Sequence, residues 1–316
     1  MKVLVIGGNR FVGRSLVLRL RFRQHEVTVL NRGTLASPKG VEVLRADRGT
    51  DDFDRVLAGR HFDAVVDFAV FTGDDARRAM RVLDTEHYLL ISTGQVYLVR
   101  EGFAGLARET DYDGTVMAGP PSPAEHADWA YGIGKREAED VIAAAPVRTT
   151  RLRIPMVSGE GDPKRRFDQY LWRMLDGGPL FVPNAMAVTR HVYRGSVVDA
   201  IVRLVEQPPA ASEVYNVAQE EQPPLRELIE MIGFAAGMRV NIIDTPVERL
   251  AGLDVRACSP FSSRWMSRLD PARAIAALDL HQVPLEQYVH ATVQHILATW
   301  GEPPPGFEQR RFELAR

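Results

Sequence analysis

Cysteine is almost absent from this chain, since Cys258 is the only one among 316 residues. A single cysteine excludes an internal disulfide and any zinc cluster that needs several thiolates, and it is typical of a reducing compartment. Histidine offers no replacement: the eight histidines are dispersed, and His290 and His295 are five residues apart, not at the spacing that brings two ligands onto one helix face. We therefore predict no metal site.

A long apolar run and an excess of one charge are also missing. No segment reaches the roughly 18 apolar residues of a membrane-spanning helix, and an expected strand begins at Lys2, so we expect no membrane span, no signal peptide and a cytoplasmic location. The formal net charge is -2, from 39 basic and 41 acidic residues. This balance gives no electrostatic reason to expect nucleic acid as a partner.

What the chain does have is an apolar strand, Lys2 to Ile6, that runs into a glycine turn and a helix expected from Phe11 to Gln24. Backbone N–H groups and the positive end of the helix dipole favour a phosphate there, and glycines let a diphosphate approach. The turn predicts a dinucleotide site, although Arg10 stands where the usual pattern often has a middle glycine. The alternative is that this glycine turn is an ordinary connector between a strand and a helix. Its residues are Gly7, Gly8, Asn9, Arg10, Phe11, Val12 and Gly13.

Short apolar strands alternate with amphipathic helical stretches through the first half of the chain. The alternation needs crossover connections and predicts an α/β fold, a doubly wound parallel sheet of the Rossmann type with its ligand beyond the carboxyl ends of the strands. The expected strands are 2–6, 26–30, 41–44, 64–68, 88–92 and 149–154.

The pattern loosens after about residue 155, where glycine and proline separate shorter elements. We expect a nucleotide-binding domain over 1–158, with a return from about 190–220, and a smaller, mainly substrate-binding lobe over 159–316. The tail 302–316 contains three consecutive prolines and is expected to be extended or loosely attached. Helices are expected at 196–206, 225–236 and 285–300.

Two segments carry residues suited to moving a proton. Tyr131 and Lys135 lie one turn apart at the start of an expected helix, so the cation should lower the pKa of the phenol and suit Tyr131 to acid–base chemistry. Ser92 and Thr93 end the fifth expected strand, where the Thr93 hydroxyl would share a substrate oxygen with the tyrosine. The plain alternatives are a surface pair for the first segment and hydroxyls bonded to local backbone for the second.

In this order the motifs resemble the extended short-chain dehydrogenase/reductase superfamily, the NAD-dependent epimerase/dehydratase family that includes UDP-galactose 4-epimerase. The resemblance covers most of the chain and implies a bound nicotinamide dinucleotide, with Thr93, Tyr131 and Lys135 as catalytic residues and Lys135 also at the nicotinamide ribose. It places Asp47 near the adenine, where a strand-end cap is the alternative. The matching segments are 7–13, Asp47, 68–70, 93–97, 131–135, 152–159 and 215–218.

The same resemblance implies that Phe68, Ala69, Val70 and Ile154 line the cofactor, although core packing alone would also explain apolar residues there. The dehydratases of the family carry an acidic pair straight after the catalytic threonine. Here Gly94 and Gln95 follow it, so a 4,6-dehydratase is not expected. The glycine turn also resembles a branch that includes chloroplast stem-loop RNA-binding proteins and bacterial reductases.

The end of the second expected strand bears on the choice of cofactor. An acidic residue there would bind the adenosine ribose and repel a 2'-phosphate, whereas arginine can pair with that phosphate. Asn31 and Arg32, with Arg10 as a second cation, therefore favour NADP, with NAD as the second choice. The alternative is that both arginines simply face solvent.

For the substrate, the resemblance implies that Arg190 binds the diphosphate of a sugar nucleotide, a role that suits a bidentate guanidinium. Arg264 is a weaker candidate, and Trp129 would wall the pocket; surface salt bridges and packing are the alternatives. We expect an epimerase or reductase that transfers hydride to or from a hydroxyl or ketone carbon of a sugar nucleotide or similar carbonyl compound. The rival is a non-catalytic dinucleotide-binding regulator or RNA-binding relative. A homodimer is common in the family.

Overall fold

The computed structural model describes residues 1–315, which form two compact units. The first contains Met1–Pro155, Gly195–Ala218 and Leu269–His281; the second contains Met156–Arg194, Gln219–Arg268 and the chain from Gln282 onward. The sequence placed Leu269–His281 with the second lobe. It joins the first unit because Leu269 is buried in a cluster with Val96 and Tyr97, and Asp270 donates its N–H to the Ala107 carbonyl at 2.9 Å.

A seven-stranded sheet forms the centre of the first unit, in the order β11-β7-β5-β4-β1-β2-β3. Every neighbouring pair is parallel, so the predicted doubly wound α/β sheet is confirmed. The strands are β1 (Lys2–Ile6), β2 (Glu26–Asn31), β3 (Glu42–Arg45), β4 (His61–Asp67), β5 (Asp84–Thr93), β7 (Arg148–Ile154) and β11 (Glu213–Asn216).

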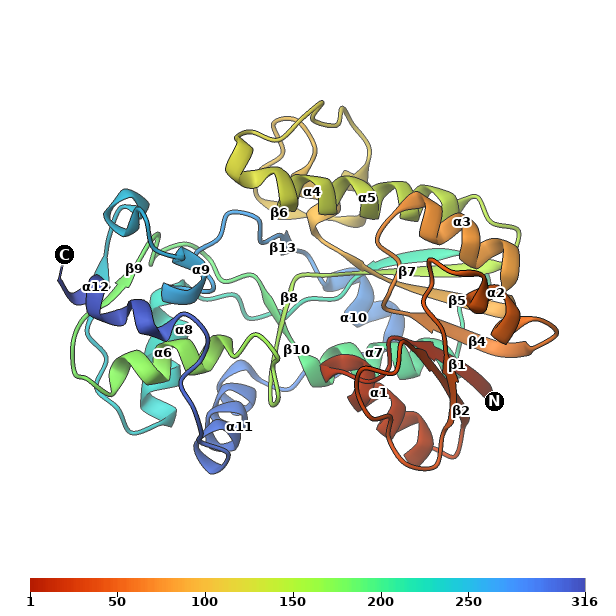
Figure 1. Ribbon diagram of the computed structural model, residues 1–316. Helices are drawn as coiled ribbons and strands as arrows, with labels where there is room; N and C mark the ends of the chain where they lie inside the picture. Colours follow the sequence, from red (N-terminus) through yellow and green to blue (C-terminus); the bar gives the residue numbers. More distant parts are fainter. Residues whose placement is uncertain (316) are drawn as a thin grey trace. The chain divides into compact units, whose positions relative to one another are not determined.

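Helices cover both faces of this sheet, which is why its strands are nearly continuous apolar runs. Figure 1 shows α3 (Gly73–Val82) and α5 (His126–Ala143) on one face and α1 (Phe11–Phe22) and α7 (Arg194–Glu206) on the other. The chain leaves β1 in one direction for β2 and later crosses to β4 on the opposite side of β1. Such a reversal opens a crevice at the carboxyl ends of the strands, where doubly wound sheets bind ligands.

The second unit is built around three helices and two short pairs of parallel strands. Helices α6 (Arg166–Met174), α8 (Leu225–Ala235) and α11 (Leu285–Ala298) enclose an apolar core that includes Tyr170 and Tyr288. The paired strands are β8 (Met156–Ser158) with β10 (His191–Tyr193), and β9 (Leu180–Val182) with β12 (Ile242–Asp244).

The expectation of a loosely attached tail is wrong for the described residues. Glu313, in α12 (Arg310–Leu314), forms an ion pair with Arg173 in which both side chains are 1% exposed. The Phe307 ring packs edge-on against Trp172 with 5.4 Å between ring centroids. A buried ion pair and aromatic packing therefore anchor the segment that the prolines interrupt. Within residues 1–315, no helix is both long enough and apolar enough to cross a membrane.

The other elements are α2 (Asp51–Leu57), α4 (Gln95–Leu98), β6 (Leu106–Ala107), α9 (Val255–Cys258), β13 (Arg268–Leu269) and α10 (Ala272–Leu278), with short 3-10 helices at Glu109–Tyr112, Pro123–Glu125, Val247–Leu250 and Phe307–Gln309.

Candidate active site

The glycine turn between β1 and α1 fits a bound phosphate. A Cβ atom at Gly13 would lie 2.8 Å from the Gly7 carbonyl oxygen and 2.9 Å from the Gly8 Cα, so only glycine lets α1 close onto the turn. Arg10 is the N-cap without a capping hydrogen bond from its side chain, and the first turn of α1 contains no acidic residue. The positive end of the α1 dipole therefore meets no acidic side chain of its own first turn, which suits this end of the helix to an anion.

Two further residues of the turn have features suited to ligand contact. Phe11 has a φ of +38°, a backbone conformation that side-chain-bearing residues rarely adopt and that is concentrated at ligand sites. Asn9 is 8% exposed, and its amide donates to the Leu35 carbonyl at 2.8 Å. Its Oδ1 is buried with no partner among the described residues, which leaves an acceptor for a donor on a ligand. Val12 is 8% exposed and packs into the core.

The carboxyl ends of β2 and β3 present arginines around Asn31. The Asn31 Oδ1 accepts the N–H of Gly33 at 2.7 Å, which shapes the turn after β2. Arg32 is exposed, with its Nη1 3.9 Å from Asp47 Oδ2. Arg45 was missed by sequence reasoning: it is the register partner of Asn31 in the parallel β2–β3 pair. The Arg45 side chain also lies against the turn after β2, since a Cβ at Gly33 would be 3.5 Å from the Arg45 Cδ.

The segment after β4 lies against the glycine turn. A Cβ at Gly7 would be 3.2 Å from the Phe68 Cβ, and the Ala69 N–H donates to Asp67 Oδ1 at 2.9 Å. Val70 has no exposed surface and packs in the apolar core, so its side chain does not line a ligand site. Ile154, at the end of β7, accepts the Gly94 N–H at 3.0 Å.

The structure brings Thr93 and Tyr131 together. The Thr93 hydroxyl, at the end of β5, forms a hydrogen bond with the Tyr131 phenol. Helix α5 begins at His126, so Tyr131 lies in its second turn rather than at its start. A Cβ at Gly134 would come within 2.5 Å of the Phe71 carbonyl oxygen, so glycine there lets α5 pack closely against the segment after β4.

Lys135 lies deeper than Tyr131. Its side chain is buried, its Nζ donates to the Ile91 carbonyl at 2.8 Å, and the same atom lies 5.3 Å from the centre of the Phe71 ring. Burial lowers the pKa of Lys135 to about 8. The expectation of a lowered tyrosine pKa is wrong here: burial raises the pKa of Tyr131, and the hydrogen bond from Thr93 only partly opposes this.

A buried ion pair that sequence reasoning missed joins β7 to α5 near the candidate site. Arg153 of β7 and Glu139 of α5 meet at 2.6 Å, with side chains 2% and 0% exposed. Glu139 also accepts the Ser92 hydroxyl, and Arg153 donates to the Tyr97 hydroxyl at 2.7 Å. The sequence did contain one indication of this pair, because Glu139 lies one helical turn beyond Lys135 on α5.

The predicted substrate residues belong to different units. In the second unit, Arg190 lines a cavity of about 810 Å³ together with Arg264 and Phe261, and its Nη1 donates to the Met266 carbonyl at 3.0 Å. Burial, and then the nearby Arg268, lower the pKa of Arg190. In the first unit, the Trp129 indole donates to the Met117 carbonyl at 3.3 Å, so its polar edge already has a backbone partner.

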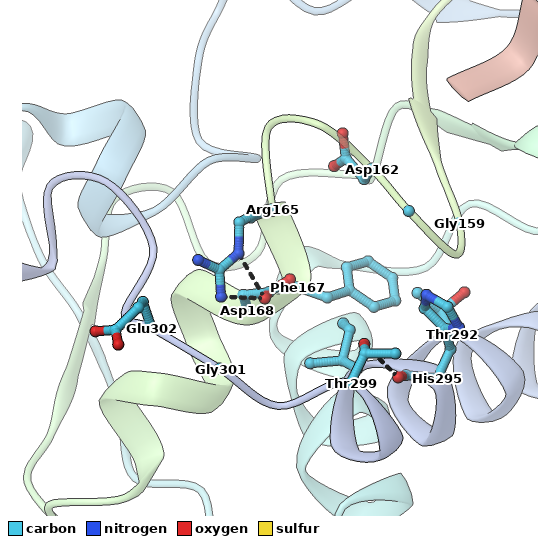
Figure 2. A pocket seen from close by; sticks show the side chains of 12 residues that line it. Gly159, Asp162, Arg165, Phe167, Asp168, Thr292, His295, Thr299, Gly301 and Glu302 are labelled. Atoms are coloured by element: carbon cyan, nitrogen blue, oxygen red, sulfur yellow. Dashed lines mark hydrogen bonds and ion pairs between the residues drawn. The ribbon is translucent and has the colours of Figure 1, made fainter. Parts of the chain in front are cut away.

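Two other clusters of polar side chains lie outside the predicted site. Figure 2 shows a second-unit cavity of about 290 Å³ in which Arg165 and Asp168 point toward each other and form an ion pair. Within the described chain, His61, Asp63 and Glu86 bring possible metal-binding atoms within 4.8 Å of one another. These three lie near the amino ends of β4 and β5, away from the carboxyl ends that carry the candidate site. The prediction of no metal stays a prediction.

Comparisons with known proteins agree with the motifs. The model of the NAD dependent epimerase/dehydratase family matches residues 3–218. The 2'-dehydrokanamycin reductase of Streptomyces kanamyceticus is 26% identical over 279 residues, which cover 84% of this chain and 75% of that protein. The chloroplast stem-loop binding protein of 41 kDa b of Arabidopsis thaliana is 23% identical over 257 residues, which cover 75% of this chain and 63% of that protein.

Solved structures of similar fold include the UDP-glucose 4-epimerase of Thermus thermophilus in complex with NAD, at 22% identity and a TM-score of 0.69, covering 94% of this chain and 99% of that one. The UDP-glucuronic acid 4-epimerase of Bacillus cereus, in complex with UDP-glucuronic acid and NAD, is 18% identical with a TM-score of 0.71, covering 95% and 100%. The family match spans more than half of the chain and confirms the resemblance drawn from the motifs: this chain belongs to the NAD-dependent epimerase/dehydratase family.

Proposed function

We propose that this protein is an NADPH-dependent reductase that delivers a proton from Tyr131 to the carbonyl oxygen of a phosphate-bearing sugar substrate, with sugar nucleotides as the substrate class. One observation carries the proposal: Tyr131 is hydrogen-bonded to Thr93 and its pKa is raised by burial. The phenol therefore keeps its proton at neutral pH, as a general acid for carbonyl reduction must. Thr93 would hold the same oxygen while negative charge develops on it.

The residues at the carboxyl edge of the sheet fit a nicotinamide dinucleotide. The turn from Gly7 to Gly13 and the N-terminal end of α1 would hold the diphosphate, and Lys135 would hold the nicotinamide ribose. Arg32, whose Nη1 lies 3.9 Å from Asp47 Oδ2, and Arg45, the register partner of Asn31, would supply two guanidinium groups to a 2'-phosphate. When bound, the dinucleotide supplies the hydride.

Arg190 supports a substrate that carries phosphate. Its guanidinium donates to one carbonyl oxygen, meets no carboxylate in the described part of the chain, and has Arg268 as a like-charged neighbour. Such a group is stabilised by an anion. We propose that the first unit binds the dinucleotide and the second unit the substrate. The solved B. cereus relative holds UDP-glucuronic acid, which is an anion of this class.

Epimerisation is the second candidate, because the full-length structural matches include epimerases in complex with NAD. Cofactor handling separates the two reactions: an epimerase returns the hydride to the same molecule and keeps its cofactor, whereas a reductase exchanges cofactor at each turnover.

The test begins with chromatography of the denatured extract and titration of the protein with NADPH and NADH. A reductase should retain no dinucleotide, bind NADPH more tightly than NADH, and oxidise UDP-glucose or UDP-glucuronic acid with NADP, with Tyr131→Phe as the matched inactive control. Stoichiometric retained NAD and interconversion of 4-epimers without added cofactor would establish the epimerase instead. Full activity of Tyr131→Phe would exclude Tyr131 as the proton donor, and the absence of both reactions in a protein that still binds the dinucleotide would favour a binding protein.

A further inference from the structure

Asp67 is a fully buried carboxylate at the end of β4 that the proposed reaction does not use. It accepts hydrogen bonds from the Arg48 guanidinium, from the Tyr88 hydroxyl at 2.8 Å and from the Ala69 N–H at 2.9 Å. The Arg48 side chain is itself 9% exposed and lies over the Phe53 ring. A buried carboxyl group that accepts hydrogen bonds from this many donors is held in one position.

This carboxylate lies on the strand next to the atom that holds Lys135. Asp67 is the register partner of Leu90, and the following residue, Ile91, provides the carbonyl oxygen that accepts the Lys135 Nζ. The same end of β4 leads into the loop whose Phe71 ring lies under that ammonium. Asp67 is thus linked to Lys135 through the sheet on one side and through the loop on the other.

The charges that face the Lys135 ammonium come from several elements: Asp67 of β4, Glu139 of α5 itself, Arg48 from the connection after β3, and Asp75 of α3. Arg48 is paired with Asp67, and Glu139 is paired with Arg153. The two pairs are each close to neutral, so Lys135 adds a positive charge that no direct ion pair cancels in the described structure. Each of these two ion pairs stabilises the Lys135 ammonium only to the extent that its carboxylate lies closer to that ammonium than its guanidinium does.

We propose that Asp67 is a positioning residue for Lys135: its carboxylate, held by Arg48 and Tyr88, stabilises the buried ammonium, and its bond to Ala69 fixes the loop beneath that ammonium. The inference rests on the proposed function only in that Lys135 is taken to act while charged. Asp67 touches neither substrate nor cofactor in this scheme.

The charges of the pair should act on Lys135 in opposite directions. Burial is the main cause that lowers the pKa of Lys135, Asp67 is the strongest of the charges that raise it, and Arg48 lowers it. Removal of the Asp67 charge should therefore lower the pKa of Lys135 further, and removal of the Arg48 charge should raise it. A purely structural contribution to folding predicts no such opposition.

The chain offers a clean measurement because it contains only four lysines, Lys2, Lys39, Lys135 and Lys164. Isotope-labelled lysine would be titrated by NMR in the full-length protein without any cofactor, and the Lys135 signal assigned by its loss in Lys135→Met. Relative to the unchanged protein, we expect the pKa of Lys135 to rise by about one unit in Arg48→Gln and to fall by about one unit in Asp67→Asn, the size of shift that a neighbouring charge commonly gives. Tyr88→Phe, which removes a hydrogen bond but no carboxylate, is the matched control and should shift it least.

The double variant Arg48→Gln/Asp67→Asn replaces the buried ion pair by two amides and keeps the test decisive if Asp67→Asn does not fold. The pKa of Lys135 should be lower in this double variant than in Arg48→Gln. Equal values in these two proteins, or shifts of the same sign in both single variants, would overturn the proposal. The alkaline limit of NADPH binding should follow the same order. Because the lysine titration needs no reaction, failure of the proposed function would leave it unaffected.

Discussion

The hydroxyl of Thr93 is hydrogen-bonded to the phenol of Tyr131, which joins the carboxyl end of β5 to the second turn of α5. Tyr131 remains 37% exposed, and its ring lies 6.4 Å from that of Phe71. A phenol so placed has a fixed partner within the protein and an open side toward a ligand.

Tyr131→Phe should lower kcat by about 10²–10⁴-fold, the usual contribution of a positioned general acid. The change removes one hydroxyl from a partly exposed ring, so the melting temperature and the Kd for NADPH should stay close to those of the unchanged protein. Thr93→Ser, which keeps the hydroxyl, should retain much more activity than Thr93→Val. Steady-state kinetics beside thermal melts would measure this, and equal loss in the Ser and Val variants would contradict the role of the hydroxyl.

Lys135→Met should stabilise the protein below pH 8, because burial lowers the pKa of the ammonium to about 8 from its ordinary value of 10.5. Between these values the unfolded chain binds more protons than the folded one, so the stability of the unchanged protein rises as the pH rises from 8 to 10.5. The advantage of the Met variant should be at most about 3 kcal/mol near neutral pH, at about 1.4 kcal/mol per unit, and should shrink over that window. Urea unfolding at several pH values measures it, and a pH-independent difference would refute it.

Arg32→Asp should reverse the cofactor preference. The substitution puts a carboxylate where a 2'-phosphate is expected and removes a cation, so NADPH should bind at least about tenfold more weakly while NADH is little affected. Fluorescence titration with both cofactors gives the two Kd values. Arg55→Ala is a suitable control, since Arg55 is an exposed arginine of α2 paired with Asp52. A parallel loss for NADPH and NADH would argue against recognition of the 2'-phosphate.

Arg190→Ala should raise the KM for a UDP-sugar by about tenfold or more and leave kcat within a fewfold, because a guanidinium that binds the diphosphate contributes equally to substrate and transition state. The KM of Arg190→Lys should lie between those of the unchanged protein and Arg190→Ala, since an ammonium keeps the charge but loses the bidentate geometry. An unchanged KM for UDP-sugars would remove the support for this substrate class.

Arg153→Met should cost about 3–5 kcal/mol of folding stability, because it leaves the buried Glu139 carboxylate without its partner. The matched control is Arg77→Met, which breaks an exposed pair with Asp74 and should cost less than about 1 kcal/mol. The double variant Arg153→Met/Glu139→Gln should recover part of the loss. Chemical denaturation would show the difference, and equal costs for Arg153→Met and Arg77→Met would contradict it.

The sequence by itself determined the layers and the order of the motifs. Apolar runs of strand length alternate with amphipathic helices, and this periodicity is local, so the parallel sheet and the glycine turn from Gly7 to Gly13 could be predicted without any tertiary contact. The helix from Tyr131 to Lys135 and the strand that ends at Thr93 followed from the same kind of signal. Their spacing along the chain placed both at the carboxyl edge of one sheet.

The electrostatics of that edge of the sheet depend on tertiary packing. The position of the Lys135 Nζ at the Ile91 carbonyl, and the burial that raises rather than lowers the pKa of Tyr131, depend on which atoms lose their water when distant segments pack. Strand pairing alone placed Arg45 beside Asn31, and packing alone turned the side chain of Val70 into the core. The residue types in the sequence indicate which chemistry is possible. Desolvation and electrostatic interactions depend on the folded chain, because they are set by neighbours that are remote in sequence.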